Sequence, residues 1–166
     1  MIINFDKLYT TKDELIYVDR TNPYNVAALF VNIACSYNPN DDTNFIEMLQ
    51  YLMGENQPIS ALMRQQIKDR MTQNDKYPFI GKSYFKGATP NNDYTPSIPY
   101  EIEVTENDYS RQEEGYVRLF LKSGGADSPR PITVRLAKDG NYYIWSDSFM
   151  GILSDIRPLE SSNPWA

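Results

Sequence analysis

The sequence predicts an α+β fold in which three N-terminal helices pack on an antiparallel sheet of four to five strands. Apolar residues recur at helical spacing within residues 21–75, whereas apolar and polar residues alternate at strand spacing within residues 100–145. Helices gathered in the first part of a chain and strands in the last part are typical of the α+β class. A cone of helices around a curved sheet, or a small β-barrel in the C-terminal half, is the alternative.

We expect residues 1–166 to form a single domain, because this length buries one sizeable core. Residues 21–75 form its helical part, and residues 76–100 an irregular segment rich in aromatic residues and proline. Residues 100–158 contain the antiparallel sheet and a C-terminal apolar clasp.

The first helix is expected at residues 23–37, since Asn22 suits the cap and a proline occupies the first helical position. The second follows a polar run at residues 38–42 and stops at Gly54. The third carries an apolar stripe over residues 59–71.

Two short segments are ambiguous. Residues 15–18 fit either a short strand or a clasp on the core. The segment 76–100 is too aromatic for a disordered linker, so we expect it to pack against the domain, with one short strand at residues 82–86.

The C-terminal part predicts a meander of strands joined by turns. Asp139 and Gly140 form a tight turn between the last two strands, which is a strong hairpin signal. The expected strands span residues 100–105, 116–122, 132–137 and 141–145, and the apolar clasp follows at residues 148–156.

The chain contains no histidine and one cysteine, Cys35, and its formal net charge is −6. This composition excludes a disulfide, a Cys/His zinc site, a Ser-His-Asp triad and a Cys-His dyad within one chain. Cys35 is interpreted as a small core residue. The run at residues 38–42 lacks the glycine and the glutamate of a calcium loop, so we read it as turn and capping residues. We therefore expect no metal and no cofactor.

The net charge, the apolar runs and the first residues predict which partners and which cellular location to expect. Nucleic-acid binding depends on basic side chains, so we expect no nucleic-acid partner. The longest apolar run is far shorter than the roughly 18 residues of a membrane span, so we expect no membrane association. The first residues lack the pattern of a secretory signal, which predicts a cytoplasmic protein.

The loop at residues 123–131 is more elaborate than a hairpin requires, with two glycines, Asp127, and Arg130 between two prolines. One interpretation is an anion site, with glycine N–H donors and Arg130 as a fork for carboxylate or phosphate. The other is a structural corner, in which Asp127 accepts backbone N–H groups and Arg130 pairs with an acid.

The polar face of the predicted sheet offers a second candidate site. Arg118, Arg135 and Trp145 could line a groove for a planar or carboxylate-bearing ligand. The alternative is ordinary cross-strand pairing of these arginines with Glu101 and Glu103. Tyr94, in the aromatic segment, completes the set of candidate ligand or partner contacts.

Several motifs between about Tyr77 and the C-terminus resemble an uncharacterised bacterial family that carries a domain of unknown function. They are GATP at residues 87–90, SGGADSPRP at 123–131, GNYYIW at 140–145, SDIR at 154–157 and PWA at 164–166. The resemblance implies a bacterial, intracellular setting and no particular activity. Tyr143 stands where the family pattern leads us to expect tryptophan.

Our leading functional hypothesis is a non-catalytic interaction or ligand-binding module, because the chain lacks the usual catalytic constellations. Its partner would be another protein or a small anionic ligand. The alternative is a histidine-free enzyme or small-molecule binder with a cavity between helices and sheet, where an acid and tyrosines transfer protons. Acids near aromatic residues are Asp93, Asp127, Asp147 and Asp155. A third possibility is an assembly subunit that oligomerises through its third helix.

Overall fold

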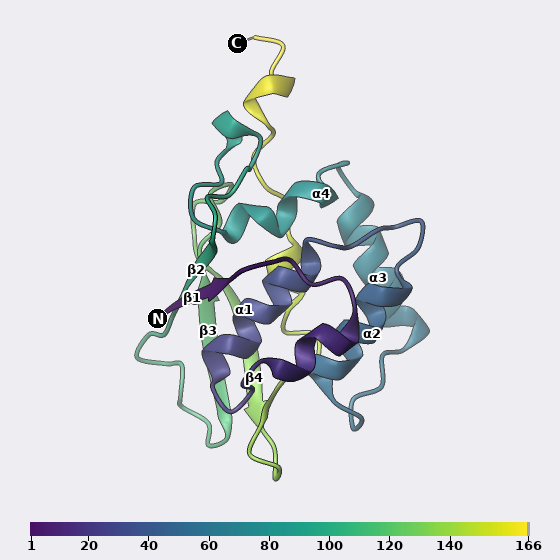
Figure 1. Cartoon of the computed structure of the whole chain (residues 1–166), viewed down its shortest axis with the longest axis vertical. Helices are drawn as coiled ribbons and strands as arrows, with labels where there is room; N and C mark the ends of the chain where they lie inside the picture. The colour runs from purple at the N-terminus through teal and green to yellow at the C-terminus, as the bar shows by residue number, and fades with distance from the viewer. Residues whose placement is uncertain (166) are drawn as a thin grey trace.

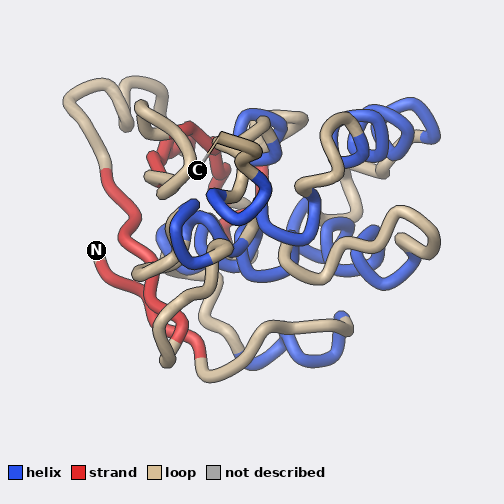
Figure 2. The backbone as a smooth tube through the Cα atoms, turned by 90° about the horizontal axis from the view of Figure 1, so that it is seen from above, coloured by secondary structure: helices blue, strands red, loops and turns tan. Residues whose placement is uncertain are grey.

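The computed structural model describes residues 1–165, and its sheet has five antiparallel strands in the order β1-β2-β3-β4-β5 (Figure 1). The strands are β1 (Ile2–Phe5), β2 (Tyr100–Thr105), β3 (Tyr116–Leu121), β4 (Arg130–Leu136) and β5 (Tyr142–Ile144). Helices lie on one side of the molecule and strands on the other (Figure 2). The α+β class is confirmed. Ala166, the last residue of the PWA motif, lies outside the described residues.

The sheet curls into a half-barrel, and its strands pair over different lengths. β3 and β4 pair along the whole of β3, from Tyr116 to Leu121. In contrast, β2 pairs with β3 only through Val104 and Thr105, while the rest of β2 pairs with β1. The sheet therefore turns sharply at β2, and the curved-sheet alternative describes its shape best.

The three expected helices are present as α1 (Pro23–Ala34), α2 (Thr43–Met53) and α3 (Ala61–Thr72). The side chain of Asn22 accepts a hydrogen bond from the backbone N–H of Tyr24 at 2.9 Å, which starts α1 as its sequence indicates. α1 ends three residues before the predicted Tyr37. Residues 26–34 are all buried, so α1 is the central helix of the core.

Three local predictions were wrong or incomplete. Residues 15–17 belong to a 3₁₀ helix, η1 (Lys12–Tyr17), which Val18 caps, and the expected strand at 82–86 is replaced by α4 (Tyr77–Ile80) and the 3₁₀ helix η2 (Lys82–Tyr84). Their local hydrogen bonds satisfy backbone groups that have no neighbouring strand. β1 was not predicted, because four residues carry little periodicity and its partner β2 is distant in sequence.

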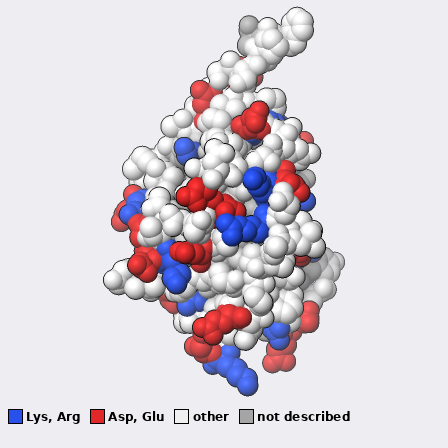
Figure 3. Space-filling view, turned by 90° about the vertical axis from the view of Figure 1, so that its right-hand side faces the viewer, with Lys and Arg blue, Asp and Glu red and all other residues white. Residues whose placement is uncertain are grey.

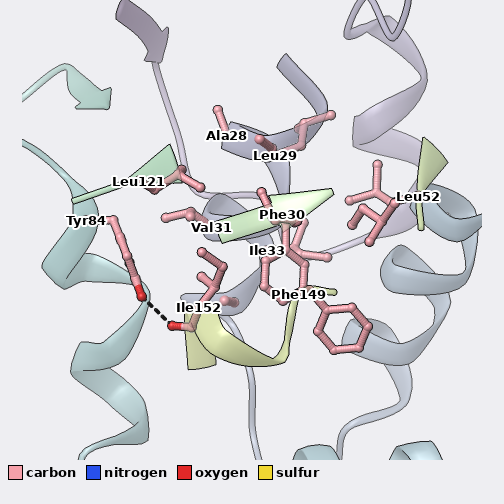
Figure 4. Packing of buried hydrophobic residues seen from close by; sticks show 14 of the residues in the cluster. Ala28, Leu29, Phe30, Val31, Ile33, Leu52, Tyr84, Leu121, Phe149 and Ile152 are labelled. Carbon is pink, nitrogen blue, oxygen red and sulfur yellow. Dashed lines mark hydrogen bonds between the residues drawn. The ribbon is translucent and has the colours of Figure 1, made fainter. Parts of the chain in front are cut away.

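The remaining short 3₁₀ helices are η3 (Pro90–Asn92), η4 (Met150–Leu153) and η5 (Glu160–Ser162). In the C-terminal clasp, Phe149 packs against Phe30 of α1 with ring centroids 5.1 Å apart (Figure 4). The Tyr84 hydroxyl donates to the carbonyl oxygen of Ile152 at 2.6 Å (Figure 4). Apolar side chains thus fill the space between α1, the sheet and the clasp. Among residues 1–165, no helix combines the length and apolarity that crossing a bilayer requires.

Candidate functional site

The loop at residues 123–131 is held by hydrogen bonds within the protein. The backbone N–H of Gly124 donates to the carbonyl oxygen of Ser83 at 2.7 Å, and that of Gly125 donates to the Ser123 hydroxyl at 3.0 Å. The Ser123 hydroxyl in turn donates to the Ser83 hydroxyl at 2.7 Å. The two glycine N–H groups that an anion would need are therefore already engaged.

Arg130 and Asp127 also have partners within the fold. Arg130 Nη1 donates to the carbonyl oxygen of Ser154 at 2.8 Å and to the Tyr84 hydroxyl at 3.0 Å. Asp127 forms a solvent-exposed ion pair with Arg157. These partners differ from those of the predicted structural corner, since Arg130 binds carbonyl oxygens rather than an acid, and Asp127 binds a side chain rather than backbone N–H groups.

Tyr94 lies beneath this loop. Its side chain has no solvent exposure, and its hydroxyl donates to the carbonyl oxygen of Arg157 at 2.6 Å. A Cβ atom added to Gly125 would lie 2.5 Å from the Tyr94 hydroxyl oxygen, so loop and ring are in close contact. Tyr94 is thus enclosed by the fold.

In contrast, Arg118, Arg135 and Trp145 share the outer face of the sheet. Alternation places them there, because the neighbouring positions of β3 and β4 are buried, as is Ile144, which precedes Trp145. Arg135 is the cross-strand partner of Tyr116, and Arg118 is the partner of Thr133. The Arg135 Cζ atom lies 4.7 Å from the ring centroid of Trp145 and 5.0 Å from that of Tyr116. Three of the six candidate residues therefore lie on one surface.

The expected pairing of Glu101 and Glu103 with these arginines does not form. Both glutamates lie in the part of β2 that pairs with β1, beyond the short contact between β2 and β3. Glu101 instead pairs with Lys86 at 3.6 Å. Because the sheet turns at β2, the carboxylates are carried away from Arg118 and Arg135.

Two hollows lie on either side of Trp145. The first, of about 1110 Å³, lies between the C-terminal end of α2 and the β4–β5 hairpin. The second, of about 520 Å³, borders the outer face of β3 and β4. Trp145 lines both hollows. We call the combined surface the arginine–aromatic groove, and define it by Arg20, Tyr51, Tyr116, Arg118, Arg135, Tyr143 and Trp145.

Arg20 is a groove residue that sequence reasoning missed. Its Cζ atom lies 4.3 Å from the ring centroid of Tyr51 in α2 and 5.0 Å from that of Tyr143 in β5. Its backbone carbonyl accepts the N–H of Tyr142 at 2.7 Å, which fixes the residue beside the edge of the sheet. Nη1 of Arg20 is buried and has no hydrogen-bond partner among residues 1–165. The guanidinium is held by aromatic faces alone.

Gly54, which follows α2, lies against the ring of Tyr143. Its φ is +84°, and an added Cβ would lie 2.9 Å from Cδ1 of Tyr143. The Tyr143 hydroxyl donates to the carboxylate of Asp139 at 2.6 Å, and this bond lowers the pKa of Asp139. Gln57 also joins the end of α2 to β5, since its Nε2 donates to the carbonyl oxygen of Ile144 at 2.8 Å.

The arginines of the groove differ from the others in their polar contacts. Arg20, Arg118 and Arg135 form no side-chain hydrogen bond and no ion pair with any of residues 1–165. The remaining arginines each donate to a carboxylate, carbonyl or hydroxyl group, and these are Arg64, Arg70, Arg111, Arg130 and Arg157. The unpaired guanidinium groups are thus concentrated in the groove, where aromatic rings orient them.

The charge elsewhere is mixed. On the face turned towards α2 and α3, acidic and basic side chains are interspersed (Figure 3). Within residues 1–165, no three acidic or cysteine side chains gather closely enough to ligate a metal ion. The groove offers guanidinium forks and aromatic surfaces, and this chemistry suits a carboxylate or another planar anion.

The fold and the site define a small α+β protein with a curled antiparallel sheet and a groove on the sheet's outer face. The chain belongs to the family described as Domain of unknown function (DUF6935), whose model matches residues 4–160. The resemblance to an uncharacterised domain is confirmed at this level. A search of curated proteins and a search of solved structures each found no match.

Proposed function

We propose that this chain is a non-catalytic binding module that captures a carboxylate-bearing ligand in the arginine–aromatic groove. The observation that supports the proposal is that, within residues 1–165, no hydrogen bond or ion pair joins the guanidinium groups of Arg20, Arg118 and Arg135 to a protein carboxylate or carbonyl. A ligand carboxylate can accept two parallel N–H donors from such a group. The bacterial, intracellular setting implied by the family resemblance belongs to the same proposal.

The groove favours capture over proton transfer. Its Asp139 carboxylate accepts the Tyr143 hydroxyl, and the lowered pKa of Asp139 makes it a weak base. The acids considered for a histidine-free enzyme are Asp93, Asp127, Asp147 and Asp155, and none of them lines either hollow. The enzyme alternative has no support from this surface.

Calorimetric titration with glutarate tests the proposal. Glutarate should bind the native protein, and binding should weaken by about tenfold in both Arg20→Gln and Arg135→Gln, since each variant loses one charge-assisted contact. Arg157→Gln is the matched control, because it removes the same charge outside the groove and should leave the affinity unchanged. No measurable glutarate binding, or equal binding by all four proteins, would reject the proposal.

A further inference from the structure

We infer that the occupant of the groove is an extended acidic peptide that crosses Trp145 and places carboxylates in both hollows, an inference that rests on the proposed function. Trp145 is the side chain that lines both hollows, so a ligand that extends from one to the other passes along Trp145. The first hollow alone, at about 1110 Å³, is already as large as a drug-sized ligand requires. An extended peptide is long enough to contact both hollows at once.

The register of β3 and β4 fits the repeat of a peptide. Arg118 is opposite Thr133, and Arg135 is two residues further along β4, so the two arginines are diagonal neighbours on one face. Diagonal neighbours have Cβ atoms roughly 7–8 Å apart. Side chains on the same side of an extended peptide recur about every 6.7 Å, which is two residues of strand rise. Alternate acidic residues of a peptide therefore match the spacing of Arg118 and Arg135.

Arg20 continues this row beyond the sheet edge. Tyr143 is the cross-strand partner of Arg135, and Arg20 lies on the far side of β5, where it accepts the N–H of Tyr142. Arg135 and Arg20 are thus separated by about two strand spacings, or about 10 Å. The separation of about 10 Å exceeds the peptide repeat of about 6.7 Å, and the length of the arginine side chains makes up the difference. The three arginines form a row across β3, β4 and β5.

Charge complementarity favours an acidic peptide over a neutral or basic one. The chain has a net charge of −6, whereas the first hollow is lined by four basic side chains against three acidic ones. Two of the four bases, Lys12 and Lys138, add attraction without fixed geometry.

Aromatic contacts preorder the three guanidinium groups. Arg20 lies between two tyrosine rings, Arg135 contacts Trp145 and Tyr116, and Arg118 Cζ is 5.5 Å from the ring centroid of Phe120. A side chain that is ordered before binding loses less entropy when a ligand arrives. The aromatic surfaces therefore serve to position the arginines towards a row of carboxylates.

Titration with three probes tests this inference: a hexaglutamate peptide, a hexaglutamine peptide of the same length, and glutarate. Hexaglutamate should bind about tenfold more tightly than glutarate, because it reaches Arg118 as well as Arg20 and Arg135. Hexaglutamine should not bind. Arg118→Gln should weaken hexaglutamate binding by about tenfold and glutarate binding by less, while Arg118→Lys should retain part of the peptide affinity.

The outcomes separate the inference from the proposed function. Glutarate binding through Arg20 and Arg135, with hexaglutamate no tighter or with Arg118→Gln unaffected, would overturn the inference and leave the proposed function in place. Failure of both glutarate and hexaglutamate to bind would reject both. Tighter binding of an oligogalacturonate than of hexaglutamate would assign the groove to an acidic saccharide and overturn the peptide. Unchanged thermal unfolding of both Arg118 variants confirms that affinity, rather than folding, is being compared.

Discussion

Arg130 donates from Nη1 to the backbone carbonyl oxygen of Ser154 at 2.8 Å and so joins the start of β4 to the segment that follows η4. The same nitrogen lies 3.0 Å from the Tyr84 hydroxyl, and Nη2 donates to the carbonyl oxygen of Asp155. One guanidinium therefore serves acceptors from two parts of the chain, η2 and the segment that follows η4. Its contacts indicate a structural clamp rather than a ligand contact.

Arg130→Met should destabilise the protein by about 2 kcal/mol, because the variant leaves partly buried acceptors without a charged donor. Urea unfolding followed by circular dichroism measures the change. Arg70→Met is the matched control: exposed Arg70 contacts the Ser154 hydroxyl at 3.1 Å, and its loss should cost less than about 1 kcal/mol. Equal stability of the two variants would contradict the clamp, and glutarate affinity should not change in either.

Gly124→Ala should lower stability by more than about 2 kcal/mol, because an added Cβ would lie 2.2 Å from the carbonyl oxygen of Ala88. Thermal unfolding reports the loss. Gly151→Ala is the control, since the nearest atom to its added Cβ is 3.9 Å away. A Gly124→Ala protein that unfolds at the native temperature would show that the 123–131 loop moves freely away from Ala88.

The sequence predicted the helices α1 to α3 and the strands β2 to β5 because each carries its own periodicity or cap. Local hydrogen bonding determines η1, α4 and η2 instead, where Tyr-Pro-Phe-Ile and similar runs have no repeating pattern. β1 depends entirely on pairing with residues about a hundred positions later, such as Ile3 with Ile102. A four-residue segment carries no sequence pattern that indicates pairing with so distant a strand.

The candidate site was predictable to a similar extent. Alternation along β3, β4 and β5 was sufficient to place Arg118, Arg135 and Trp145 on one face. Arg20 was not predictable, because it precedes α1 and reaches the groove only through its contacts with Tyr51 and Tyr143. The one available signal was a cation next to the cap of a helix that is otherwise apolar, and this signal is too common to identify a site.

Tyr37→Phe should stabilise the protein by about 1 kcal/mol. The Tyr37 hydroxyl is buried without a hydrogen-bond partner among residues 1–165, and burial raises its pKa to about 12. Its ring packs edge-on against Phe45 at 5.1 Å, a contact that phenylalanine preserves. In the control Tyr84→Phe, the lost hydroxyl has partners, so stability should fall. Urea midpoints compare the two, and destabilisation by Tyr37→Phe would show that its hydroxyl has a partner.

Stability should fall in acid partly through Glu14. Its ion pair and hydrogen bond with Lys7, and the backbone N–H groups of Thr10 and Thr11, lower the pKa of Glu14 from 4.5 to about 2. A lowered pKa in the folded state stabilises the protein above pH 4.5, and this stabilisation is lost as the pH falls towards 2. Unfolding measured at several pH values should show a smaller decline across this window in Glu14→Gln than in the native protein.

Glu103→Gln provides the control for removing one carboxylate, because Glu103 is exposed on β2. Its stability should follow the pH dependence of the native protein across the same window. Identical pH profiles for Glu14→Gln and the native protein would show that the Glu14 carboxylate does not retain these contacts in solution.

Gly54→Ala tests whether the groove depends on the position of Tyr143. The added Cβ would lie 2.9 Å from Cδ1 of this ring, so the ring must move, and with it one of the two aromatic faces that hold Arg20. Glutarate affinity should fall by about threefold to tenfold as Arg20 loses its fixed orientation. Calorimetric titration at a temperature where the variant is folded measures this change.

Backbone strain needs a separate control, because φ of Gly54 is +84° and alanine is strained there whatever the space. Gly140 in the β4–β5 turn has the same φ of +84°, but its added Cβ would meet no atom within 4 Å. Gly140→Ala should therefore lose similar stability and keep its affinity for glutarate. If both variants bound glutarate equally well, the position of the Tyr143 ring would have no part in holding Arg20 for a ligand.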